Sequence, residues 1–189
     1  MFLRLLPAVA LAIATSSAAA QSAATLLPAQ SEIAFTTRQM GVPVEGRFGR
    51  FSARIELDPK KPETGRIEFT IDTASARFGT AELDAELGKP IWLAVAAFPQ
   101  ASFQSSAIRA AGPGRFEVTG RLTIKGQTRE TVVPVELAAA GGTNATASGR
   151  FTIRRLDFRV GEAEWSDTSL LANDVLVRFR LTLAGLGPL

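Results

Sequence analysis

The residues that could carry out chemistry in this chain are restricted to carboxylates and lysines, because the sequence contains neither His nor Cys. A Ser-His-Asp triad, a Cys-His pair and a His-based metal site each need a missing residue type. The densest acidic cluster, Glu82, Asp84 and Glu86, lies in a predicted helix, where residues two apart point to different faces. EF-hand spacing is also absent. The sequence therefore predicts no catalytic residue of these classes, no metal site and no cofactor.

A second acidic group lies at residues 162–167, where Glu162 and Glu164 precede Trp165 on an irregular stretch. A paired-carboxylate hydrolase needs two such groups about 5 to 10 Å apart across a cleft. Solvated surface acids are the commoner explanation of such a cluster. A carboxylate-dependent hydrolase stays open as an alternative, and a cleft that pairs two acids with raised pKa values would favour it.

Apolar side chains at period two offer a different chemistry, which is the binding of an apolar molecule. The clearest case is residues 115–137, where apolar and polar residues alternate on either side of Lys125-Gly126. Gly allows the positive φ of a two-residue turn. Counting outward from that turn gives three pairs: Ile124 with Gln127, Val118 with Val133, and Phe116 with Val135. The apolar residues of both strands then share one face, while Pro134 lies on the other face and weakens the ladder because it lacks an N–H.

The same alternation predicts eight strands, at residues 31–37, 44–57, 66–72, 101–108, the two halves of 115–137, 146–155 and 175–183. Gly49 predicts a bulge or bend in the second of them. Local hairpin order and long strands favour a closed eight-stranded antiparallel barrel over a two-sheet sandwich. The fold class is therefore all-β. One short helical segment is expected near residues 80–98; it opens at Thr80, is interrupted at 88–90 and has a second helical piece at 91–97.

The inward positions of this barrel mix small residues with aromatic ones. Such a mixture either leaves an elongated apolar cavity or fits the taper of a packed barrel. Trp165 is interpreted as loop packing, and Trp92 as a lid over the barrel. The candidate ligand-binding residues, each of which would otherwise be plain core, are Phe35, Phe69, Trp92, Phe103, Phe116, Phe151 and Phe179.

The first twenty residues have the pattern of a secretory signal peptide. Arg4 precedes an apolar run, and Ala18-Ala19-Ala20 ends it with an A-x-A cleavage site. Residues 21–189 would then form one exported domain without disulfides. The longest later apolar run, 91–98, is too short to span a bilayer. Basic and acidic residues are interspersed at a net charge of +3, so nucleic-acid binding is not indicated.

Six stretches of the chain resemble one family. They are SEIAF, VEGRFGRFSARIELDP, the Phe98-Pro99 pair followed by ASFQS, VTGRLTIKGQTRETVVPVEL, FTIRRLDFRVGEAEW and DVLVRFRLTL. They resemble the YceI-like family of exported lipid-binding proteins, most specifically at Gly120–Thr128 and at Arg155-x-Asp157-Phe158. The resemblance implies a lipocalin-like barrel that holds a long isoprenoid or quinone-like lipid in the lumen, in the periplasm, without catalysis. The chain departs from the family's acidic pattern at residues 90–94.

Two alternatives to this non-catalytic carrier remain, the carboxylate-dependent hydrolase and a stress-related interaction module with a solid barrel. The volume of the cavity separates the carrier from the solid module. A homodimer is left open by the sequence.

Overall fold

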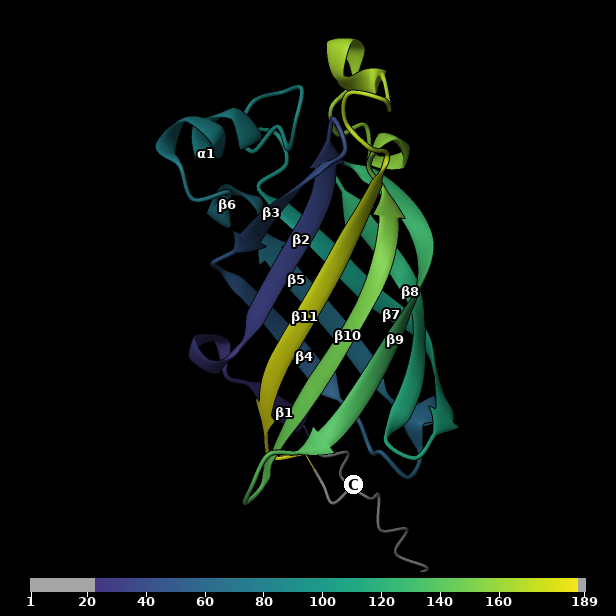
Figure 1. Ribbon diagram of the computed structural model, residues 1–189. Helices are drawn as coiled ribbons and strands as arrows, with labels where there is room; N and C mark the ends of the chain where they lie inside the picture. The colour runs from purple at the N-terminus through teal and green to yellow at the C-terminus, as the bar shows by residue number, and fades with distance from the viewer. Residues whose placement is uncertain (1–22, 187–189) are drawn as a thin grey trace, which may run out of the picture.

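The computed structural model describes residues 23–186, which form a closed antiparallel β-barrel with one short α-helix (Figure 1). The expected signal peptide at 1–20 lies outside the described residues and stays a prediction, as does the domain range 21–189. The all-β fold with eight strands is confirmed. In order around the ring the strands are β1 (Ala23–Leu26), β4 (Phe51–Glu56), β5 (Arg66–Asp72), β7 (Gln100–Gly112), β8 (Arg115–Ile124), β9 (Gln127–Ala139), β10 (Asn144–Arg154) and β11 (Asp174–Ala184). Pairing of β1 with β11 closes it.

Two of the barrel strands are broken. A 3₁₀ turn at Pro28–Gln30 separates β1 from β2 (Glu32–Gln39), and β3 (Val42–Phe48) is separated from β4 at Gly49. β2 pairs with β11 and with β3, so β1–β2 and β3–β4 together make one long hairpin. The predicted bend at Gly49 is confirmed, and its N–H donates to the Ser75 carbonyl at 3.1 Å. The short strand β6 (Ala76–Arg77) pairs with Arg47 and Phe48, the last two residues of β3 before this bend.

The β8–β9 hairpin has the register that the sequence predicts. All three expected pairs are present, and Lys125 and Gly126 have φ values of 47° and 73°, as a type I′ turn requires. The ladder between β9 and β10 is limited to Glu136–Ala139 against Ala145–Ser148. It stops before Pro134, in agreement with the missing N–H of that residue.

The helix is shorter than expected. α1 (Ala81–Leu87) begins at Thr80, whose hydroxyl accepts from the Leu83 N–H at 3.4 Å. The second helical piece expected at 91–97 is wrong, because this stretch forms successive turns. Ala94 has a positive φ of 48°, and the Leu93 N–H reaches back to the Leu87 carbonyl. Among residues 23–186, no helix is both long and apolar enough to cross a membrane.

The lower end of the barrel, where β1 lies in Figure 1, is filled by a hydrophobic core. Burial of these side chains is the main source of stability in a chain without disulfides. The core contains Leu26, Ile55, Leu57, Ile108, Phe116, Val118, Val133, Leu137, Ala145, Ala147, Leu181 and Leu183. The upper end, near α1, is closed by irregular segments instead.

Gly149 makes room for the aromatic ring of Phe179, between the lower core and the upper half of the barrel. It is paired with Phe179 across β10 and β11. A Cβ at Gly149 would lie 2.5 Å from Phe179 Cζ and closer still to the Pro134 carbonyl oxygen. Gly46 and Phe35 make the same kind of cross-strand pair on β3 and β2. These positions admit no larger side chain unless the ring or the backbone moves.

Gly149→Ala is therefore expected to destabilise the barrel by about 1–3 kcal/mol, although Gly to Ala ordinarily stabilises a strand. Chemical denaturation measures the difference in free energy of unfolding. Gly88→Ala is the matched control, because the nearest atom to its Cβ is an ordinary contact at 3.6 Å and the φ of Gly88 is −74°. Equal stability of the two variants would contradict the crowding at Gly149.

Candidate functional site

The upper half of the barrel contains a cavity of about 420 Å³ that is partly open to solvent. This volume is within the range of small-molecule sites. The strands β2, β3, β5, β7, β8, β10 and β11 form its walls. The apolar residues that line it are Ile33, Phe35, Val44, Phe48, Phe69, Ile71, Phe78, Leu83, Leu87, Trp92, Leu93, Ala101, Phe103, Leu122, Ile124, Phe151, Ile153, Phe158, Val160, Trp165, Leu171, Val175 and Val177.

Five of the seven predicted ligand-binding residues line this cavity: Phe35, Phe69, Trp92, Phe103 and Phe151. The register explains how three wall residues meet at one height, because Val177 on β11 is opposite Phe35 on one side and Phe151 on the other. Their position in the cavity wall agrees with the sequence analysis, and their role in binding stays a prediction.

Phe116 and Phe179 do not line the cavity, which corrects their expected place in an open lumen. Phe116 is only 6% exposed and belongs to the lower core. Phe179 packs against that core from above, over Gly149. It shares the inward phase of Val175 and Val177 but lies one step deeper on β11. Phe179 therefore lies just beneath the cavity lining, at the end that we call the cavity floor, between that lining and the lower core.

Two segments cover part of the cavity from above, and we call residues 89–98 and 155–172 the cap. The second contains the 3₁₀ turns Arg155–Phe158 and Ala163–Ser166. The Gly161 N–H donates to the Ile91 carbonyl at 2.8 Å, which joins the two segments. The rings of Trp92 and Trp165 lie 5.4 Å apart, and both line the cavity. Trp165 is thus a wall residue as well as a packing residue of its loop.

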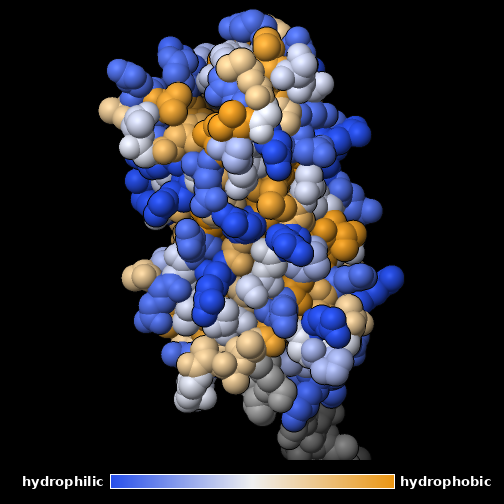
Figure 2. Space-filling model, in the orientation of Figure 1, coloured by the Kyte–Doolittle hydropathy of each residue, from blue (hydrophilic) through white to orange (hydrophobic). Residues whose placement is uncertain are grey.

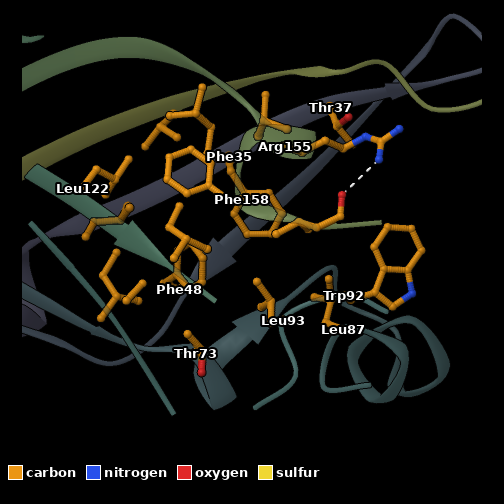
Figure 3. A pocket seen from close by; sticks show the side chains of 18 of the residues that line it. Phe35, Thr37, Phe48, Thr73, Leu87, Trp92, Leu93, Leu122, Arg155 and Phe158 are labelled. Carbon is orange, nitrogen blue, oxygen red and sulfur yellow. Dashed lines mark hydrogen bonds between the residues drawn. The ribbon is translucent and has the colours of Figure 1, made fainter. Parts of the chain in front are cut away.

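Arg155 holds the second cap segment together. Its guanidinium donates to the carbonyls of five residues: Ala172 (3.0 Å), Val160 (3.0 Å), Gly161 (2.6 Å), Trp165 (2.5 Å) and Leu171 (2.7 Å). Figure 3 marks one of these bonds. An Arg side chain has five N–H donors, so every donor is used. The residue is 2% exposed, and burial lowers its pKa. Arg155 is a structural clamp with no donor left for a ligand.

Lys125 ties both cap segments to the β8–β9 hairpin. Its Nζ donates to the Arg159 carbonyl at 2.6 Å and to the Ile91 carbonyl at 3.3 Å. Burial lowers the pKa of Lys125, and nearby Glu162 opposes this shift. Gly126, the second turn residue, packs closely against the cap, since a Cβ at this position would lie 2.8 Å from the Phe98 ring. The two most specific motifs of the sequence thus both position the cap.

Of the acidic residues that the sequence analysis considers, Glu86 lines the cavity, and Glu82, Asp84, Glu162 and Glu164 do not. Glu86 is the one carboxylate that lines the cavity within residues 23–186, and it pairs with Lys89. On the 162–167 loop, the Ser169 hydroxyl and N–H donate to Asp167 and lower its pKa, the opposite of a raised value. Three or more candidate metal ligands do not converge anywhere in the described range.

Sequence reasoning missed several wall residues. Leu122 shares the inward phase of its hairpin strand, so the pattern already contained its signal. Phe48 and Phe51 are three residues apart, so they would face opposite sides of a regular strand, and the break at Gly49 turns both toward the interior. The positions of Phe158 and Arg155 could not be predicted from the alternation of apolar residues, because both residues lie in a 3₁₀ turn outside the strands.

The exposed apolar surface gathers around the cavity end. Five of the six large apolar side chains exposed within residues 23–186 lie there, and the sixth, Val132, is on the side of the barrel. Figure 2, which views the molecule from the same side as Figure 1, shows hydrophobic residues at the upper end, next to α1. The five are Met40, Val42, Leu83, Phe98 and Leu170.

Comparisons with known proteins agree with this architecture. The model of the YceI-like domain matches residues 25–183. A UPF0312 protein from Ectopseudomonas mendocina is 28% identical over 120 residues, which cover 61% of this chain and 63% of the relative, so the match spans under two thirds of that protein. The crystal structure of Burkholderia cenocepacia BcnA is 39% identical, with a TM-score of 0.80, and the match covers 83% of this chain and 98% of that one. A polyisoprenoid binding domain from Saccharophagus degradans shares the fold at 15% identity, with a TM-score of 0.70 over 87% of this chain and 99% of that one.

Proposed function

Since the chain belongs to the YceI-like family, we propose that it is a non-catalytic carrier of a long isoprenoid or quinone-type lipid, held in the upper half of the barrel. The Saccharophagus degradans domain of the same fold is described as polyisoprenoid binding, which supports a ligand of this class. The expected signal peptide supports a place in the periplasm, where such a carrier would move an apolar molecule through water.

The observation that carries the proposal is the apolar cavity itself. Its wall is mostly aromatic and aliphatic, and the side chains of the lower core leave the upper half of the barrel unfilled. Burying a hydrocarbon yields about 0.8 kcal/mol per CH₂. A lipid tail therefore needs no charged partner to bind here. A fully packed barrel, as the interaction-module alternative requires, would leave no such volume.

Val177→Trp is expected to abolish lipid binding, because the indole would occupy the cavity at the height of Phe35 and Phe151. Val132→Trp is the matched control, since this Val is 50% exposed on the outside of β9. The measurement is native mass spectrometry of each purified protein, with apolar extraction to identify what is released.

The wild type and the Val132→Trp variant should carry a long-chain lipid, and the Val177→Trp variant should not. If the wild type shows only the bare polypeptide mass and takes up no polyprenyl probe, the carrier proposal is wrong. If Val177→Trp still binds the lipid while keeping the thermal stability of the control, the lipid lies elsewhere.

A further inference from the structure

One polar atom of the cavity has no partner. Thr37 Oγ1 is buried without a hydrogen bond, the one such side-chain nitrogen or oxygen within residues 23–186. Thr37 follows Ile33 and Phe35 on the inward phase of β2 and lines the cavity. Figure 3 shows it at the same end as Arg155 and Trp92, with Leu122 at the other. A buried hydroxyl without a partner costs about 1–3 kcal/mol.

None of the other polar groups that line the cavity is hydrogen-bonded to this hydroxyl. Arg155 uses all five donors on backbone carbonyls and offers no lone pair. The Thr73 hydroxyl is bonded to the Phe98 carbonyl at 2.8 Å, and Glu86 pairs with Lys89. Beside Thr37 the wall is formed by Phe35 on β2 and by Val44, which is paired with Thr37 on β3. Gln39 is the next inward residue of β2 toward the cap.

We infer that Thr37 binds the polar head of the carried lipid, donating a hydrogen bond to an uncharged oxygen such as a quinone carbonyl or a prenol hydroxyl. This inference rests on the proposed function and adds an orientation. The head lies under the cap, and the tail extends toward Phe179. A charged phosphate head is disfavoured, because Arg155 is the one basic residue of the cavity lining and its donors are taken.

Thr37→Val tests this inference with two probes, a benzoquinone that carries a decyl chain and decylbenzene, which has no oxygen. The loss of one hydrogen bond should weaken binding of the quinone by about 2- to 13-fold. Binding of decylbenzene should stay equal or improve. Thr37→Ser keeps the hydroxyl and should restore the affinity for the quinone. Titration against the purified protein gives each dissociation constant.

The ligand-free proteins supply a second readout. Thr37→Val should melt at the same temperature as the wild type or higher, because it removes a buried unpaired hydroxyl and keeps the shape. An equal loss of affinity for both probes, or no loss for the quinone, overturns the role of Thr37 and leaves the carrier function standing. If neither probe binds to the wild type, both the carrier function and this inference are overturned.

Discussion

Replacing Arg155 by Met is expected to lower the free energy of unfolding by at least about 3 kcal/mol and to release the cap from the barrel. Five carbonyls in two buried and three part-buried hydrogen bonds lose their donor together, and Met offers none in return. Each carbonyl left unpaired costs about 1–3 kcal/mol, in part relieved as the segment opens to water. Arg155→Lys should lose stability as well, because the compact ammonium of Lys cannot reproduce the planar fork of five donors in the guanidinium.

Chemical denaturation and amide hydrogen exchange across residues 155–172 measure this effect. Arg154→Met is the matched control, since the neighbouring Arg is 65% exposed and bonded to Asp157 at 3.2 Å. An exposed ion pair of this kind contributes about 0–1 kcal/mol. Equal losses in the two variants would show that Arg155 does not organise the cap. A cap that exchanges quickly in an otherwise folded barrel would confirm the assignment.

The second large effect is expected at the cavity floor. Phe179→Ala should cost up to about 3–5 kcal/mol of stability and should also lengthen the cavity, because the ring packs against the core one step below the lining residue Val177 of β11. Two further buried CH₂ groups would raise the affinity for a longer chain by about tenfold. The optimum length in a series of alkyl probes should therefore shift upward.

Phe116→Ala serves as the control for this shift. Phe116 lies inside the lower core, so its loss should destabilise the barrel by a similar amount and leave the length preference unchanged. Thermal melts and dissociation constants over the probe series distinguish the two variants. An unchanged optimum in Phe179→Ala would show that Phe179 does not set the depth of the site.

The sequence by itself was sufficient for most of the strands and for the pairing of one hairpin. Alternation identified every ring strand except β1, and Lys125-Gly126 gave the register of the β8–β9 hairpin, because two-residue turns admit few backbone conformations. Gly49 and Pro134 marked the places where a strand bends and where a ladder stops. Such features depend on residues a few positions apart, so local pattern suffices to predict them.

Only the tertiary structure decided which inward residues meet the cavity. Phe35 and Phe179 have the same inward phase, yet one lines the cavity and the other closes its floor. Alternation predicts the face of a sheet that a side chain occupies, but not its height along the barrel axis. Height follows from the register of all eight strands and from what fills the other end.

The structure of the cap could not be predicted from the sequence either. The carbonyls that Arg155 binds lie 5 to 17 positions along the chain, on turns without any periodic pattern. Residues 91–97 have a helix-favouring composition, but their backbone hydrogen bonds fold them back onto α1 and over the barrel. Composition records local preference, whereas the closed end of the cavity is determined by hydrogen bonds between segments that only folding brings together.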